Sequence, residues 1–406
     1  MKKIGNGILN SLIPLFTVSF VSHIAPYIYI PSLPDIAKSL GISTSEAGGM
    51  MSAYYMALSV TLLFAGAVGD MCNKGKILTA ASLIIAFGSL LGALPTPYVV
   101  VLAGWALQGV GAAAITIVGQ TWIGQSSDKG NLTSRFSYLS IALSFAPLIA
   151  PVVGGMITEA LSWKYNFFIV SFLCFLSAIF IYKNISLAPA PIRKANVSLR
   201  GTLSDYVALV TRSKFMPIVC TSLACFLFQG MLMAYSSFLF IDQLGLTPAL
   251  YGLISIPVVT GCIVGQFPVL YLEKRHGLTA AFIFNSVVAV LALLFSLLFY
   301  AINGSHTIRE LAVVILVFSI GFGGHTLLAT RNVMAVFSSR RSHSSALMNF
   351  LDQFAGYIAS VAVQLLFAFI GSAIIVHNAA CAITIAFVSF TTFIYIRTVK
   401  NNELSL

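Results

Sequence analysis

The sequence predicts an all-α membrane protein in which twelve transmembrane helices form two six-helix bundles. Hydrophobic residues make up 58% of the 406 residues, charged residues make up 8%, and the mean hydropathy is +0.96. A soluble domain carries about 25% charged residues. A helix needs roughly 20 apolar residues to cross a bilayer, and the chain contains twelve runs of about that length.

The apolar runs follow one another with short polar breaks and one longer interval. In order, they cover approximately residues 10–33, 46–69, 77–95, 97–124, 132–159, 163–184, 214–241, 250–272, 279–302, 309–337, 344–370 and 373–397. The interval 185–213 contains Pro189, Pro191 and several bases but no apolar span. We therefore expect one bundle in residues 1–184, a cytoplasmic linker in 185–213, and a second bundle in 214–406.

Lysine and arginine gather in alternate loops, and this pattern predicts the orientation of the chain. Of the 22 basic residues, Lys38, Lys164 and Arg309 fall on one side and Arg331 falls within a span, while all the others fall on the opposite side. By the positive-inside rule both termini are cytoplasmic, which suits the inner membrane of a bacterium. The net charge of +11 does not indicate a nucleic acid partner, because the bases are scattered over short loops.

The loop between the second and third runs carries an aspartate, a tight turn and two lysines. Gly66 permits a close approach of backbones, and Asn73 and Gly75 are expected to adopt the left-handed conformation of a short reversal. We interpret Asp70, with Gly66 and Lys74, as a latch that forms and breaks as the two bundles move. The alternative is an ordinary short loop between membrane helices.

Over essentially its whole length the chain resembles the Major Facilitator Superfamily, and within it the bicyclomycin-resistance branch of drug:proton antiporters. The superfamily loop between helices 2 and 3 reads G-x-L-a-D-r-x-G-r-k. Gly66, Asp70 and Lys74 match this pattern, whereas Met71 and Asn73 replace the usual arginine and glycine. The resemblance implies that Asp70 faces the N-terminal end of helix 11 in one transport state, where a helix N-terminus stabilises an anion.

The fifth run contains a second resemblance to the antiporters. Residues 146–155 are similar to the helix 5 motif G-x-x-x-G-P-x-x-G-G, and the candidate residues of this motif are Pro147, Pro151, Gly154 and Gly155. Small residues let helices pack closely, and proline bends a helix. The alternative is a kinked helix contact without a role in the direction of transport.

Two positions depart from the antiporter pattern. Helix 4 usually reads R-x-x-Q-G-x-G, but Trp105 occupies the arginine position, and Tyr27 occupies the position of the usual helix 1 acid. The resemblance ties both missing charges to proton coupling. Their joint loss is physically consistent, because either charge alone would be buried without a partner. Proton coupling through the usual residues is therefore not expected.

Ionisable side chains inside spans are costly and are functional candidates for that reason. Asp352 is interpreted as the one carboxylate well inside a span, and Arg331 lies at a depth at which the two could pair. They form either a static ion pair, or a site in which Asp352 exchanges a proton or Arg331 meets an anionic substrate. His23 and His325 are either packing residues or proton carriers.

Uncharged polar and aromatic residues supply the expected substrate pocket. Its candidate residues are Tyr27, Trp105, Gln108, Gln229 and Gln353. No metal site or cofactor is expected, because the cysteines and histidines show no ligand spacing.

The predicted function is secondary active transport of a small organic molecule by alternating access, most simply proton-coupled efflux of the multidrug type. The alternative is transport of a specific anionic metabolite or a metal chelate such as a siderophore. An enzyme is not expected, because H-E-x-x-H, G-x-S-x-G and nucleotide-binding motifs are absent from the sequence. The expected partners are the small molecule, protons and the lipid bilayer, and nothing requires more than a monomer.

Overall fold

The computed structural model describes residues 2–126, 132–184, 199–212, 215–336 and 341–400. Side chains are described in these ranges except at residues 2–12, 66–71, 124–126, 132–144, 199–203, 221, 334–336, 341–343 and 399–400. Throughout the described ranges the regular structure is helical, without strands.

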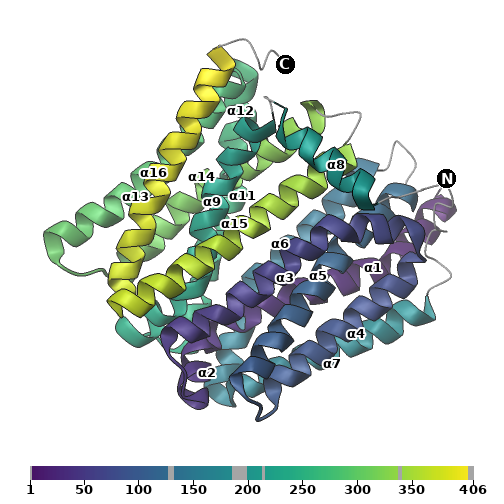
Figure 1. Cartoon of the computed structure of the whole chain (residues 1–406), viewed down its shortest axis with the longest axis horizontal. Coiled ribbons are helices and arrows are strands. Elements are labelled where there is room, and N and C mark those ends of the chain that lie inside the picture. Colours follow the sequence, from purple (N-terminus) through teal and green to yellow (C-terminus); the bar gives the residue numbers. More distant parts are fainter. Residues whose placement is uncertain (1, 127–131, 185–198, 213–214, 337–340, 401–406) are drawn as a thin grey trace.

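The first half of the chain forms a group of long helices joined by short turns (Figure 1). Within it α3 packs against α5, α4 packs against α5 and α7, and α1 packs against α6. The helices are α1 (Lys2–Ile28), η1 (Ile30–Ser32), α2 (Leu33–Leu40), α3 (Thr44–Met71), α4 (Lys74–Ala93), α5 (Tyr98–Ser126), α6 (Leu132–Ala160) and α7 (Trp163–Lys183).

The second half forms a similar group, in which α9 packs against α15 and α16, and α14 packs against α11 and α13. Its helices are α9 (Phe215–Ser237), the π-helix η3 (Phe238–Gln243), α10 (Pro248–Gly252), α11 (Ser255–Val264), α12 (Gln266–His276), α13 (Leu278–Asn303), α14 (Ile308–Val336), α15 (Arg341–Ile370) and α16 (Ala373–Lys400). Another helix, α8 (Leu199–Val210), follows the first half in the chain and contacts α3, α9 and α15 near the end of the molecule that holds the termini (Figure 1).

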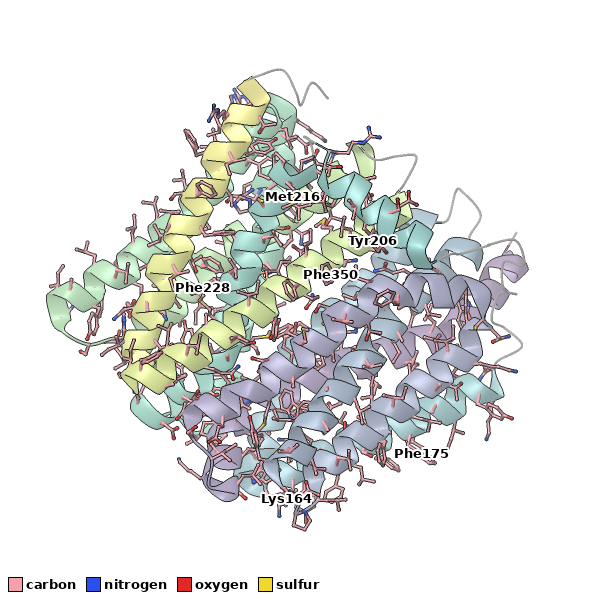
Figure 2. All side chains as sticks on the ribbon, in the orientation of Figure 1. Lys164, Phe175, Tyr206, Met216, Phe228 and Phe350 are labelled. Carbon is pink, nitrogen blue, oxygen red and sulfur yellow. The ribbon has the colours of Figure 1, made fainter. Side chains whose placement is uncertain are left out.

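The helices have the length and composition of membrane spans. Among the described residues, eleven helices are long and apolar enough to cross a membrane. The remaining helix, α6, has 29 residues, of which the apolar segment Phe145–Ala160 carries described side chains. Exposed apolar side chains such as Phe175, which projects outward from α7 (Figure 2), suit contact with lipid. The expected all-α membrane architecture is therefore confirmed.

Three segments differ from the helices expected from the apolar runs. The first run continues past its expected end through η1 and α2 to Leu40, where Gly41 ends the helix with φ 64°. The run 250–272 is divided among α10, α11 and α12. The interval 185–213, expected to hold no span, contains the 12-residue helix α8, whose Tyr206 hydroxyl donates to the Leu63 carbonyl of α3 at 3.2 Å.

The long helices run between two ends of the molecule. Both termini lie at one end, which we call the terminal end (Figure 1). The opposite end, called the far end below, holds α2, η3 and the turns that follow α4, α13 and α15.

The two halves meet where α3 packs against α15 and where α6 packs against α10 and α11. Several polar contacts join the halves toward the far end. Lys38 Nζ lies 2.9 Å from Asp242 Oδ1, the Ser52 and Ser360 hydroxyls are 2.7 Å apart, and Glu159 Oε2 accepts from the backbone N–H of Ala249 at 3.2 Å. The far end is therefore closed in this conformation.

Candidate functional site

A cavity of about 170 Å³, which we call the central cavity, lies between the two halves. Helices α1, α3 and α5 of the first half and α9 and α15 of the second half supply its wall. Its polar and aromatic lining comprises Ser22, His23, Tyr27, Tyr54, Tyr55, Thr116, Gln120, Phe226, Gln229, Asn349 and Gln353.

A second cavity, of about 230 Å³, lies beside the first and is called the side cavity below. Tyr27, Gln229 and Met233 line both cavities. The Tyr55 hydroxyl lies 3.0 Å from Met233 Sδ and thus links the halves at the central cavity. Together the two volumes fall within the range of roughly 300–1,000 Å³ that is usual for small-molecule sites.

The walls of both cavities carry no formal charge. Among their described residues there is no Asp, Glu, Lys or Arg, and His23 is the one histidine. His23 Nδ1 lies 2.8 Å from the Ser19 carbonyl, within its own helix. Tyrosine hydroxyls and amides supply hydrogen bonds, and aromatic rings and methionine supply apolar contact. This lining suits an uncharged, amphipathic molecule.

The structure brings four of the predicted residues together at the central cavity: His23, Tyr27, Gln229 and Gln353. Trp105 and Gln108 are not part of either wall. Each is 1% exposed inside the first half. The Trp105 ring lies 5.3 Å from the Tyr29 ring, centre to centre, so α5 turns these two side chains toward its own bundle and not toward α9 and α15.

The helix 5 motif lies at the junction between the halves. Pro147 and Pro151 line the side cavity. A Cβ atom at Gly154 would collide with the Ile28 carbonyl of α1, and one at Gly155 would collide with the Pro248 carbonyl of α10. Both glycines thus permit a close approach that no other residue permits, and Gly155 does so across the two halves.

Asp352 and Arg331 do not pair in this structure. Asp352 is 3% exposed, does not line either cavity, and accepts from the Ser222 hydroxyl of α9 at 2.8 Å. Arg331 has a half-exposed side chain and lies 2.6 Å from Glu273 Oε2 on α12. The expected pairing is therefore wrong. Arg331 lies near the terminal end, where its side chain reaches a carboxylate on the neighbouring α12 and not the interior.

His325 lies away from both cavities. It is 1% exposed and its Nε2 lies 3.2 Å from the Ser286 hydroxyl of α13. Its ring also contacts the Phe282 ring of α13, so it lies inside the second half. Its role as a proton carrier stays a prediction.

The proposed latch is only partly described. Gly66 and Asp70 belong to the last turns of α3, and their side chains lie outside the described residues. Lys74 begins α4 and is fully buried. Asn73 is the N-cap of α4 with φ −65°, and its side chain accepts from the Lys76 N–H at 3.1 Å. The expected left-handed turn at Asn73 and Gly75 is therefore wrong, because capping of α4 makes the reversal and Gly75 is already helical.

Sequence reasoning missed a polar cluster in the second half. Glu310 is 6% exposed, so Asp352 is not the only buried carboxylate. Its Oε2 lies 2.9 Å from His306 Nδ1, and His377 of α16 is stacked edge-on against His306. The H-x-x-x-E spacing at the start of the tenth run is the signal that could have found it. Among the described residues, no three His, Cys, Asp or Glu side chains are placed to hold a metal ion.

A family model described as the Major Facilitator Superfamily matches residues 15–360. The chain is 25% identical over 166 residues to multidrug resistance protein D of Escherichia coli, covering 41% of this chain and 42% of that protein. It is 24% identical to the chloramphenicol resistance protein CraA of Acinetobacter baumannii, over 68% of both proteins. It is 26% identical to the uncharacterised transporter YdgK of Bacillus subtilis, over 82% of this chain and 83% of that protein.

Solved transporters share the fold. A POT family transporter in complex with a thioalcohol-conjugated peptide superimposes with a TM-score of 0.77 at 14% identity, covering 97% of this chain and 96% of that one. A bacterial homologue of the human lysosomal transporter Spinster, in an inward-facing and unoccupied conformation, gives a TM-score of 0.72 at 11% identity, covering 96% of both chains. At these identities the likeness concerns the fold alone.

Proposed function

Because this chain belongs to the Major Facilitator Superfamily, a family of membrane transporters and not of enzymes, we propose that it exports an uncharged, amphipathic small molecule by alternating access. The observation that carries this proposal is the neutral central cavity between the halves, to which both halves contribute. Transporters built from two repeats bind substrate at such an interface and expose it to one side at a time.

The arrangement of contacts supports alternating access. The polar contacts Lys38–Asp242 and Ser52–Ser360 join the halves between the central cavity and the far end. Breaking them would open that end, while the packing within each half can persist. With the termini in the cytoplasm, as the distribution of lysine and arginine predicts, the far end faces the outside.

The direction and the coupling ion are part of the proposal. The names of two relatives, a multidrug resistance protein and a chloramphenicol resistance protein, favour efflux, although the matched segment of the first is less than half of that protein. Proton exchange would drive the export. Asp352 is the candidate carrier, because it is a buried carboxylate on α15 beside Gln353 of the cavity wall.

The alternative substrate, an anionic metabolite or a metal chelate, finds less support. Such a substrate calls for a cation in the pocket, since arginine binds carboxylates through paired hydrogen bonds. Arg331, which sequence reasoning assigned to this task, bonds to Glu273 instead and lies outside the wall of both cavities.

Transport in proteoliposomes with an imposed pH gradient tests the proposal. The candidate substrates are chloramphenicol, as a neutral amphipathic probe, and ferric citrate, as an anionic chelate. We expect gradient-driven movement of chloramphenicol by the wild type and loss of the gradient dependence in Asp352→Asn. Movement of ferric citrate without movement of chloramphenicol would contradict the proposed substrate class. Chloramphenicol transport at a rate independent of the pH gradient would contradict proton coupling.

A further inference from the structure

The buried cluster around His306 is formed by side chains from four helices, α9, α13, α14 and α16, and from the turn between α13 and α14. His306 Nδ1 lies 2.9 Å from Glu310 Oε2, and His306 Nε2 lies 2.9 Å from Asn378 Oδ1. With the Asn378 amide placed in this way, both ring nitrogens face oxygen acceptors. With the amide turned, its N–H donates to Nε2 of a neutral ring, so the contacts of His306 accommodate both a neutral imidazole and an imidazolium.

His377 extends the cluster toward α9. Its Nδ1 lies 2.7 Å from the Tyr235 hydroxyl and its Nε2 lies 3.0 Å from the Ser296 hydroxyl. The rings of His306 and His377 are 5.0 Å apart, centre to centre. Because hydroxyl groups both donate and accept, His377 satisfies its neighbours as a neutral ring.

The charge of the cluster depends on one proton. The side chains of His306 and Glu310 are 0% and 4% exposed, and Glu310 Oε1 is buried without a hydrogen-bond partner. With the proton, the pair is a neutral carboxylate–imidazolium. Without it, the cluster holds an uncompensated buried negative charge, which is strongly unfavourable.

The other groups around the pair do not compensate that charge. The facing side chains are Tyr300 of α13, stacked on His306 at 5.2 Å, Tyr235 of α9, and His377, Asn378 and Cys381 of α16. None of them carries a fixed positive charge. The neighbouring Arg309 of α14 is exposed.

The cluster is linked through η3 to one of the contacts that close the far end. Asn378 lies one turn from Ile374, whose N–H donates to Gln243 Oε1 of η3 at 2.8 Å. The next residue back along η3, Asp242, pairs with Lys38 of the first half. Tyr235 lies on α9, directly before η3, and π-helical segments of this kind are frequent at functional sites.

We propose that His306 and Glu310, with Asn378 and His377, form a proton-binding site outside the central cavity, and that its protonated form holds the far end closed. Loss of the proton leaves a buried carboxylate that is relieved by hydration, and water reaches it when η3 and α16 move away from α2. The site thus couples the pH of the compartment at the far end to the position of the gate. This inference rests on the two-half arrangement and not on the proposed substrate or direction.

Distance measurements between spin labels test this proposal without any substrate. The labels replace Val99 on α5 and Phe369 on α15, which are 72% and 87% exposed at the far end. The protein is reconstituted in lipid with its accessible native cysteines replaced by serine. As the pH falls from 8 to 5, we expect the long-distance population of the wild type to fall several-fold.

The variants separate a proton site from a structural network. Glu310→Gln removes the buried carboxylate, so the cluster never holds an uncompensated negative charge, and the variant should give the short distance at both pH values. The matched control His276→Gln alters an exposed histidine at the terminal end and should keep the wild-type response. A Glu310→Gln protein that retains the wild-type pH response, or a wild type without one, would overturn the proposal.

A second variant covers the case in which Glu310→Gln fails to fold. Asn378→Asp keeps the size of the side chain and adds a carboxylate 2.9 Å from His306 Nε2. The added carboxylate leaves one uncompensated negative charge even when His306 carries its proton, so the far end should stay open to a lower pH than in the wild type. An unchanged midpoint would contradict a proton site at His306.

Discussion

Tyr27 lines both cavities, and it stands where the related antiporters usually carry a helix 1 acid. The sequence marked this position by its departure from the antiporter pattern. The structure adds that Tyr27 shares the wall with Gln229 and Met233 of the other half. The proposed uncharged substrate follows from this wall, to which both halves contribute uncharged side chains.

Tyr27→Ala should raise the KM for a transported probe by about tenfold, because loss of aromatic contact in a binding site costs on the order of 1–2 kcal/mol. Tyr182→Ala is the matched control, since Tyr182 is 66% exposed on α7 away from both cavities. Uptake kinetics in proteoliposomes measure both. If both substitutions changed the KM equally, Tyr27 would not be part of the binding site.

Arg331→Gln should change turnover by less than about twofold. The half-exposed pair with Glu273 is of the surface kind, which is worth roughly 0–1 kcal/mol. For the same reason Arg331→Gln should not rescue Asp352→Asn. If gradient-driven transport returned in the double variant, the result would indicate that Asp352 and Arg331 pair, contrary to the structure.

Among the elements, α6 and the broken segment α10–α12 decide how closely the halves approach. The backbone of Gly155 lies against the Pro248 carbonyl, and that of Gly252 lies against the Pro151 carbonyl. These contacts join one half to the other. Their loss should therefore hinder closure of the far end more than it destabilises the fold of either half.

Gly155→Val should therefore abolish transport or reduce it by more than tenfold in a protein that still folds. A side chain there collides with backbone, which cannot give way as a flexible side chain can. Gly119→Ala is the control within one half, where the nearest atom is the flexible end of Leu15 at 3.1 Å. Thermal unfolding separates a folding defect from a closing defect, and normal transport by a stable Gly155→Val protein would contradict this role.

In the whole molecule, polar contacts that each contribute little free energy help to hold the far end closed. The Lys38–Asp242 pair is 2.9 Å long, but its side chains are 68% and 33% exposed. Such a pair contributes roughly 0–1 kcal/mol and is screened by salt. The gate can therefore open readily, and a change of one charge in the His306 cluster is large enough to shift it.

Lys38→Glu should enlarge the open population at the far end by about two- to fivefold at low salt, because it sets like charges against each other. The double variant Lys38→Asp with Asp242→Lys should restore the wild-type population. The Val99–Phe369 label distance reports both. A response that does not weaken at high salt would argue against an electrostatic origin.

The sequence by itself determined the membrane class, the helical runs and the family, because the hydropathy of a span and the turn residues between spans are local properties. It also indicated Tyr27, Gln229, Gln353 and His23, which the structure places on the cavity wall, although their part in binding stays a prediction. It could not determine where α5, α14 and α15 point their side chains. For that reason Trp105 and Gln108 were expected in the pocket and Arg331 beside Asp352.

The tertiary structure alone decided which groups meet. His306 and Glu310 are four residues apart at the start of one run, but their neighbour His377 comes from a run some 70 residues later, and no spacing within a single helix relates it to them. Rotation of a helix about its axis is set by packing against its neighbours, because every face of a buried membrane helix is apolar. The chain thus fixes the spans locally, while the cavity, the gate and the buried cluster arise from contacts between distant helices.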